Sequence, residues 1–212
     1  MSNRKYIPAL NFRWLTPFYD SIIEGPLSVT RLRRDLVAQV GDLSGRRILD
    51  VGCGTGTLAA LIKAAHPAAE VVGLDGDPQI LEIARAKARN QKLEIQFDQG
   101  MSFELPYPDE SFDVVFTSMM LHHLTRDDKQ KTALEMYRVL RPGGKLFGAD
   151  FAEPRSFVGK SIRPLTRHFE RVADNVDGFL PVMFRNAGFK NYTEGQRRYL
   201  FGSIASFQGF KN

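Results

Sequence analysis

The sequence predicts an α/β fold, with a doubly wound and mostly parallel sheet of seven strands covered by helices on both faces. Short apolar strand patterns alternate with amphipathic helical patterns over residues 47–149. A glycine-rich run at 52–56 joins the first strand to a helix through a tight turn. Two closing strand patterns, at 192–201 and 203–210, meet at a turn around Gly202 and form an antiparallel pair.

Length and composition are those of one globular domain. The 212 residues are 43% hydrophobic and 25% charged, so a hydrophobic core of normal size can form without disulfides or bound metals. The single cysteine, Cys53, lies in the glycine run and has no internal disulfide partner, which fits a reducing cytoplasm and leaves no thiol cluster for a metal. No apolar run has the length of a membrane span or a secretory signal. We therefore expect a cytoplasmic protein without a metal.

Charge is distributed unevenly along the chain, whose formal net charge is +5. Residues 1–47 contain eight Lys or Arg against four Asp or Glu, and residues 151–212 contain ten against five. The segment between them contains eleven against fifteen. Basic flanks attract anionic substrates, lipid surfaces or nucleic acid, but they also serve solubility alone. We expect at most weak membrane-surface contact and no nucleic-acid partner.

The first half of the chain alternates strands and helices in a regular order. A helix follows Ser28, and a later helix begins at Asp77-Pro78, where a capping carboxylate precedes a proline. The expected strands are 47–51 and 70–74, and the expected helices are 28–40, 57–65 and 77–91.

The second half continues the alternation and then changes character. A short strand is expected at 93–98, a loop at 100–111, a continuous apolar strand at 112–117, a helix at 128–140 and a fifth strand at 145–149. Pro142-Gly143-Gly144 breaks the helix before the fifth strand. We expect one domain over 1–212, with a helical cap at 1–45, a cofactor-binding core at 46–150, a helical lid at 151–188 and a closing β-hairpin at 189–212.

The run from Ile48 to Leu58 carries the strongest functional signal. A buried strand ends at an acidic residue, and the turn that follows allows close approach of a ligand to the backbone. Dinucleotide sites use G-x-G-x-x-G, whereas this turn reads D-x-G-x-G-x-G, and a carboxylate beside it favours a cationic ligand over a pyrophosphate. The alternative is an ordinary strand-turn-helix corner. The candidate ligand-binding residues here are Asp50, Gly52, Cys53, Gly54 and Gly56.

A second acidic residue, Asp75, ends the second strand 25 residues after Asp50. A carboxylate at this place can accept hydrogen bonds from both hydroxyls of an adenosyl ribose, and its alternative role is a loop or helix-cap carboxylate. Gly76 follows it in the same turn. The next helix places Ile80 either beside an adenine ring or simply in the core.

Two further motifs complete a family pattern. The segment from Gly100 to Asp113 reads G-M-S-F-E-L-P-Y-P-D-E-S-F-D, and the segment from Arg138 to Leu146 reads R-V-L-R-P-G-G-K-L. With the glycine turn and Asp75, these segments resemble class I S-adenosylmethionine-dependent methyltransferases over about residues 15–150, and more loosely over 185–212. The nearest resemblance is to the ubiquinone/menaquinone C-methyltransferase group. It implies S-adenosyl-L-methionine as cofactor and the strand order 3-2-1-4-5-7-6, with the seventh strand antiparallel.

The resemblance also implies individual site residues. Gly100, Met101 and Ser102 would border the adenine, although the family commonly has an acidic residue where Met101 stands. This departure leaves adenine to backbone groups, to Asp98 or Gln99, or to packing by Met101. Tyr19, in Pro17-Phe18-Tyr19-Asp20, matches a family tyrosine that covers the methionine end of the cofactor. Ser118, after the fourth strand, would lie at the same end.

Candidate catalysts follow the fourth strand. His122 and His123 could supply a general base, although adjacent histidines at a helix start also cap or pack. Tyr19, Met119 and Asp150 are expected at the same edge of the sheet. We expect methyl transfer to a small-molecule acceptor, such as a quinone precursor or another lipophilic compound. The alternatives are a non-catalytic cofactor-binding protein and a nicotinamide-dependent oxidoreductase.

Overall fold

The computed structural model describes residues 29–153, 172–199 and 202–212. Its strands are β1 (Arg47–Val51), β2 (Glu70–Asp75), β3 (Gln96–Gln99), β4 (Phe112–Ser118), β5 (Leu140–Phe151), β6 (Lys190–Tyr199) and β7 (Gly202–Phe210). Its helices are α2 (Val29–Ala38), α3 (Thr57–Ala65), α4 (Pro78–Asn90), the 3-10 turn η2 (Leu121–His123), α5 (Arg126–Val139), α7 (Ala173–Val176) and α8 (Phe179–Asn186).

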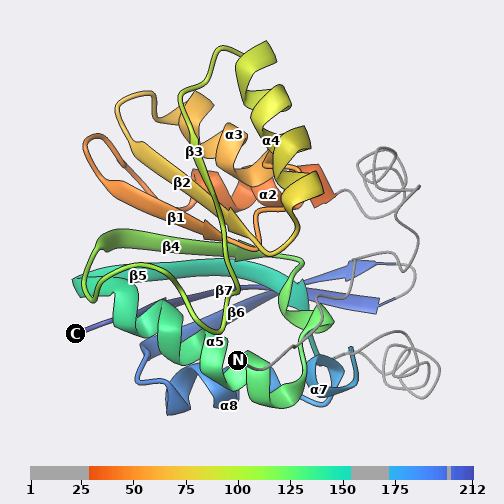
Figure 1. Cartoon of the computed structure of the whole chain (residues 1–212). Helices are drawn as coiled ribbons and strands as arrows, with labels where there is room; N and C mark the ends of the chain where they lie inside the picture. Colours follow the sequence, from red (N-terminus) through yellow and green to blue (C-terminus); the bar gives the residue numbers. More distant parts are fainter. Residues whose placement is uncertain (1–28, 154–171, 200–201) are drawn as a thin grey trace, which may run out of the picture.

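The strands form one seven-stranded sheet in the order β3-β2-β1-β4-β5-β7-β6 (Figure 1). The neighbours from β3 to β5 pair in parallel, and β7 pairs antiparallel with both β5 and β6. The predicted fold class and strand order are therefore confirmed. Parallel neighbours bring the carboxyl ends of β1, β2 and β4 to one edge of the sheet, where ligands bind in folds of this kind.

Helices cover both faces of the sheet (Figure 1). α2, α3 and α4 pack on one face with Ile48 and Phe116, whereas α5 and α8 pack on the other with Leu49 and Val115. Successive strand residues point to opposite faces, so Asp50, two residues after Ile48, points toward the layer that contains α2 and α3. This alternation decides which helix layer surrounds the Asp50 carboxylate.

Several element boundaries differ from the expectations, most clearly those of α5, β3 and β5. α5 begins at Arg126 because the hydroxyl of Thr125 accepts a hydrogen bond from the N–H of Asp128 and caps the helix. β3 begins later than expected, at Gln96. Pro142-Gly143-Gly144 lies inside β5, where the pairing with β4 shifts register, and Gly143 takes a φ of 76°.

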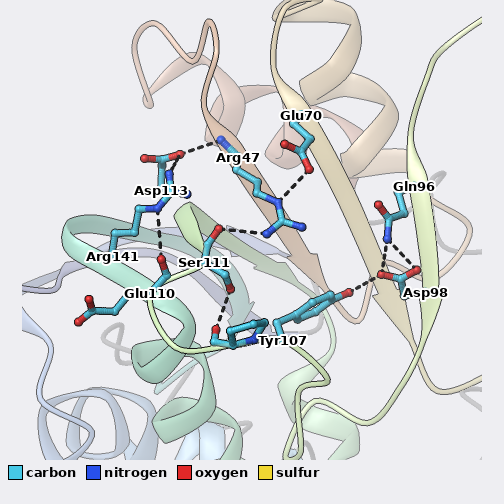
Figure 2. A network of polar contacts seen from close by, with 10 residues as sticks. Arg47, Glu70, Gln96, Asp98, Tyr107, Glu110, Ser111, Asp113 and Arg141 are labelled. Carbon is cyan, nitrogen blue, oxygen red and sulfur yellow. Dashed lines mark hydrogen bonds and ion pairs between the residues drawn. The ribbon is translucent and has the colours of Figure 1, made fainter.

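A polar network fixes the opposite, amino-terminal edge of the sheet (Figure 2). The carboxylate of Asp113 accepts hydrogen bonds from the N–H of Arg47 at 2.8 Å and from Arg141 Nη1 at 2.9 Å. Nearby, the hydroxyl of Tyr107 donates to Asp98 Oδ2 at 2.9 Å. Arg47 Nη1 also donates to the carbonyl of Ser111 at 3.4 Å, so contacts of Tyr107 and Ser111 hold the 100–111 loop as it runs from the carboxyl end of β3 back to the amino end of β4. Within the described ranges, no helix is long and apolar enough to cross a membrane.

Candidate functional site

A pocket opens at the carboxyl edge of the sheet, where the glycine turn, the end of β2, the 100–102 loop and the segment after β4 converge. Of the residues predicted for the site, those that line it are Gly52, Cys53, Gly54, Asp75, Gly76, Ile80, Gly100, Met101, Ser102, Ser118 and His123. The lining residues that the sequence analysis did not assign to a cofactor or base are Arg33, Thr55, Leu74, Met119 and Met120.

Three predicted site residues do not line the pocket, and a fourth cannot be placed. Asp50 and Gly56 lie beneath the pocket rather than on its wall, and His122 lies behind it. Tyr19 falls outside the described residues. The structure therefore separates the two adjacent histidines, because only His123 lines the pocket.

The three glycines of the turn meet different requirements. All three take positive φ, at 71° for Gly52, 53° for Gly54 and 72° for Gly56. A β-carbon at Gly52 would lie 2.8 Å from Cβ of Met120, and one at Gly56 would lie 3.0 Å from Cβ of Ala84. Gly56 therefore allows α4 to pack closely, whereas Gly52 leaves room at the pocket wall.

Asp75 is held in one orientation at the end of β2. One carboxylate oxygen accepts a hydrogen bond from the N–H of Gly54 at 2.9 Å, and the other accepts from the N–H of Asp77 at 3.0 Å. Burial raises the pKa of Asp75, and these two N–H donors oppose the shift. Each oxygen keeps lone pairs for a further donor, so the side chain can accept hydrogen bonds from a diol in the pocket.

Two opposite charges lie near each other at one end of the pocket, with Arg33 on its wall and Asp50 buried next to the glycine turn. Asp50 is 1% exposed, and its Oδ2 has no hydrogen-bond partner among the described residues. Burial raises the pKa of Asp50 to about 7, although the nearby charge of Arg33 and the N–H of Ala59 oppose the shift. Arg33 Nε donates to Ser118 Oγ at 3.4 Å and is half-buried. A buried carboxylate with one oxygen lacking a partner among the described residues favours a cationic ligand group that can approach it.

The amphipathic pattern of α2 does not by itself identify Arg33 as a pocket residue. Leu32 and Leu36 mark the buried face, and Arg33 lies at its border. Arg31 and Arg34 have the same charge but are exposed. Basic character alone does not distinguish the three arginines, since only the packing of α2 over the sheet edge brings one of them to the pocket.

A lysine of α4 braces the glycine turn from outside. Lys87 Nζ donates to Thr57 Oγ1 at 2.7 Å and to Thr55 Oγ1 at 3.1 Å. Thr55 lies on the pocket wall, so the lysine connects α4 with the wall and with the first turn of α3. This contact adds a second support for the turn besides the Gly54–Asp75 hydrogen bond.

The far side of the pocket is largely apolar. Ile80, from α4, is 5% exposed and lies on the wall with Met101. The hydroxyl of Ser102 is 2.9 Å from Oγ1 of Thr132 in α5. Asp98 is bound to Tyr107 and does not line the pocket, nor does Gln99. Met101 thus lies where a flat ring could pack, and no carboxylate from the 98–102 segment lines the wall.

The segment after β4 forms the remaining wall. Met119 donates its N–H to the carbonyl of Ala149 at 2.8 Å and takes a φ of 57°, which is unusual for a residue other than glycine. The chain then turns through η2, which presents His123 to the pocket. His122 Nδ1 instead lies 2.8 Å from Asp150 Oδ1, and 4.0 Å separates the two histidine ring centroids.

The chemistry of this site follows from its residues. Burial raises the pKa of the Cys53 thiol well above its usual value, so this cysteine is a poor nucleophile. The described residues contain no group of three or more side chains able to hold a metal. The pocket instead combines a fixed diol acceptor at Asp75, the guanidinium of Arg33 with the buried Asp50 carboxylate near it, and an apolar side at Ile80. This set fits a ligand with a ribose, a flat base and a zwitterionic end.

One family model and two relatives show which known proteins this chain is similar to. The family described as "Methyltransferase domain" matches residues 48–144. The demethylmenaquinone methyltransferase of Deinococcus radiodurans is 42% identical over 160 residues, which cover 76% of this chain and 64% of that protein. The corresponding enzyme of Thermus thermophilus is 36% identical over 178 residues, covering 84% and 74%. The chain thus spans just under two thirds of the first relative.

The fold comparison extends to an enzyme of another reaction. The crystal structure of the [4+2]-cyclase SpnF has a TM-score of 0.72, with 22% sequence identity over 93% of both chains. At this identity the similarity shows the fold alone, and the fold alone does not decide the reaction.

Proposed function

Since the chain belongs to the class I S-adenosylmethionine-dependent methyltransferases, we propose that it methylates the hydroquinone form of a demethylmenaquinone or a closely related small molecule, with S-adenosyl-L-methionine as donor. The observation that carries the proposal is the Asp75 carboxylate, oriented by two backbone N–H groups beside the glycine turn. Relatives named demethylmenaquinone methyltransferase supply the acceptor class.

The pocket residues divide the cofactor among them. Asp75 accepts hydrogen bonds from the ribose hydroxyls, and Ile80 and Met101 pack against the adenine. Asp50 attracts the ammonium group, because its buried Oδ2 has no other partner among the described residues. Arg33 attracts the carboxylate at the same end. This assignment gives a role to the two opposite charges that lie near each other at one end of the pocket.

The bound cofactor supplies an activated methyl group for an in-line displacement with a neutral leaving group. The protein therefore contributes alignment, exclusion of water and removal of a proton from the acceptor. A hydroquinone ring carbon becomes nucleophilic as a ring hydroxyl loses its proton. The carbon–methyl bond forms as the sulfur–methyl bond breaks. The methylated ring carbon then loses its hydrogen as a proton and the ring oxygen regains one, so that one proton leaves the acceptor overall. His123, as the only one of the two adjacent histidines on the wall, accepts that proton.

Segments on both sides of the core complete the proposal. The 1–45 cap brings Tyr19 over the methionine end of the cofactor, and the 151–188 lid covers a lipophilic acceptor. α2, within the cap, supports this division because its Arg33 lines the pocket. The protein works in the cytoplasm, and its basic flanks give weak contact with the membrane that holds quinones. No nucleic acid takes part.

The first test is the choice of cofactor and acceptor. Calorimetry with S-adenosylhomocysteine should show binding, whereas NAD should show none. Labelled methyl from S-adenosylmethionine should then appear on a reduced, short-chain demethylmenaquinone and not on its oxidised form. Binding of NAD alone would identify an oxidoreductase. Cofactor binding without transfer to any hydroquinone would support the non-catalytic alternative.

Asp75→Ala tests the residue on which the proposal rests. We expect S-adenosylhomocysteine affinity to fall about 100-fold, since two charge-assisted hydrogen bonds are lost, while the protein remains folded. Asp77→Ala is the matched control, because Asp77 caps α4 through the N–H of Gln79 and does not line the pocket. The control should lower stability by about 1 kcal/mol and keep its affinity. Equal affinities in both variants would remove Asp75 from the ribose site.

A further inference from the structure

A buried carboxylate lies directly behind the pocket histidine. Asp150, near the end of β5, is 1% exposed and accepts four hydrogen bonds. Its Oδ2 accepts from the N–H of Leu121 at 2.8 Å. Its Oδ1 accepts from the N–H of Phe151 at 2.8 Å and from Asn175 Nδ2 at 3.1 Å, and lies 2.8 Å from His122 Nδ1. One side chain thus joins β5, η2 and α7.

Asp150 is ionised despite its burial. Burial by itself raises the pKa of Asp150, but the charge and hydrogen bond of His122, together with the N–H of Phe151, hold the net pKa below its usual value. An ionised carboxylate only accepts hydrogen bonds, so Nδ1 of His122 carries the proton between them. This contact sets both the tautomer and the plane of the His122 ring.

The ring of His122 in turn borders His123. The two ring centroids lie 4.0 Å apart with an interplanar angle of 42°, and Phe151 meets His122 edge-on at 4.9 Å. His122 is 6% exposed, so its place behind His123 is closely packed. Any rotation of the His122 ring would change the surface against which His123 rests at the pocket wall.

α7 contributes the outermost member of this network. Asn175 is fully buried, and its Oδ1 has no hydrogen-bond partner among the described residues. The adjacent Asp174 points to α5 instead, where it pairs with Arg126 at 3.0 Å and Lys129 at 3.4 Å. A half-satisfied buried amide costs stability that an apolar side chain of similar size avoids. Packing alone therefore does not account for an asparagine at this position, whereas the hydrogen bond from its Nδ2 to Asp150 does.

We propose that Asn175 is a positioning residue for methyl transfer, which acts through Asp150 and His122 to hold His123 at the pocket wall. The inference rests on the proposed function for its catalytic consequence. It adds that α7, which contributes no residue to the pocket wall, controls the placement of the base. The hydrogen bonds of the buried network thus hold the ring of His123 in one orientation at the pocket wall.

The test replaces Asn175 by leucine, which has similar size and no donor. We expect kcat for the reduced demethylmenaquinone probe to fall about tenfold, because small displacements of a reacting group are costly. KM for the probe and affinity for S-adenosylhomocysteine should stay unchanged. The chain has four histidines, so ring carbon–proton NMR spectra resolve them, and the signals of His122 and His123 should shift.

Asp174→Asn is the matched control on the same helix. It weakens the attachment of α7 to α5 without touching Asp150, so it should lower thermal stability and leave kcat and the two histidine signals unchanged. If it reproduced the kcat loss of Asn175→Leu, the effect would be a general loosening of α7 and the proposal would fail. Wild-type kcat in folded Asn175→Leu would also overturn it.

A second pair keeps the test decisive if Asn175→Leu does not fold. His122→Asn retains a donor toward Asp150 but loses the ring, whereas His122→Phe retains the ring but loses the donor. Both should lower kcat, and both should shift the His123 signal in spectra of the cofactor-free protein. Unchanged His123 signals in both variants would refute the positioning role. Since these spectra need no acceptor, they separate failure of this inference from failure of the proposed acceptor.

Discussion

At the scale of single residues, Asp50 is hard to explain by stability. Its carboxylate is buried beside the glycine turn, and one of its oxygens has no partner among the described residues. Burying such a group without a partner costs free energy, so the position favours a role toward a ligand. The sequence predicted a cationic ligand at this carboxylate, and the structure adds Arg33 as the second charge at the same place.

Asp50 should make the stability of the cofactor-free protein depend on pH. Its pKa is about 7 in the folded state against a usual 3.8, so the folded state holds one more proton than the unfolded state between these values. The contribution of Asp50 to the free energy of unfolding is therefore fully present below about pH 4. It decreases as pH rises to about 7, by up to about 1.4 kcal/mol per pH unit. Asp50→Asn should gain stability relative to wild type over this range, as measured by urea unfolding.

The control for Asp50→Asn is Glu94→Gln, at an exposed carboxylate near the amino ends of β2 and β3 and away from the pocket. Its stability difference from wild type should stay nearly constant over the same pH range. A constant difference for Asp50→Asn as well would show that Asp50 is not the source of the pH dependence.

Arg33 should discriminate between ligands that differ only at the amino-acid end. Arg33→Met keeps the length of the side chain and removes its charge, so affinity for S-adenosylhomocysteine should fall about tenfold to 100-fold. Affinity for 5′-methylthioadenosine, which lacks the amino-acid end, should hardly change. Calorimetry with both ligands measures the difference, and the exposed Arg34→Met should alter neither. Equal losses for both ligands would contradict the contact with the carboxylate.

At the scale of elements, the glycine turn shows how one motif serves several demands. Gly56, the N-cap residue of α3, takes positive φ and provides no side-chain cap, so the turn gives up a capping hydrogen bond. The Gly54 N–H instead orients Asp75, and Lys87 braces Thr55 and Thr57. The turn therefore obtains its order from neighbouring elements rather than from its own helix.

Gly52→Ala tests the space above the turn. Gly45 takes a similar positive φ of 69° with nothing within 4 Å of a β-carbon, so Gly45→Ala measures the backbone strain alone, about 1 kcal/mol. Gly52→Ala should cost more, because its β-carbon meets Met120, and it should also reduce affinity for S-adenosylhomocysteine. Thermal unfolding and calorimetry measure the two effects. Identical behaviour of the two variants would mean that Met120 moves aside without cost.

At the scale of the whole molecule, the closing strands are attached to the core through aromatic rings. Phe184, from α8, lies 5.0 Å from Phe207 of β7 and 5.5 Å from Tyr192 of β6, between ring centroids. These rings join the antiparallel edge of the sheet to the helix layer that also contains α5. The antiparallel pair is thus part of the main core rather than an appendage.

Phe184→Ala should therefore destabilise the whole domain. The side chain is fully buried, and its removal should cost about 3–5 kcal/mol of unfolding free energy in a single cooperative transition. Val182→Ala, on the same helix but 46% exposed, should cost less than about 0.5 kcal/mol. Denaturant unfolding followed by fluorescence and circular dichroism compares them. A separate early transition in Phe184→Ala would show that the closing strands unfold independently.

Local sequence patterns predict much of the fold. β1 and α3 begin and end where the sequence predicts, because apolar residues dominate the buried parallel strand and a glycine turn marks its end. Pro142-Gly143-Gly144 was expected to break a helix, and it also forms a bulge within β5, where pairing with β4 decides the extent of the strand. Strand ends of this kind depend on a partner that local sequence does not contain.

By itself, the sequence determined the fold class, the strand order through its family resemblance, the glycine turn and Asp75, because each depends on neighbouring residues or on spacing. The tertiary structure decided which of three arginines reaches the pocket, and which of two adjacent histidines faces it. It also brought Asn175 to Asp150, 25 residues away along the chain. Adjacent residues share the same local sequence, so only the packing of helices against the sheet can give them different environments.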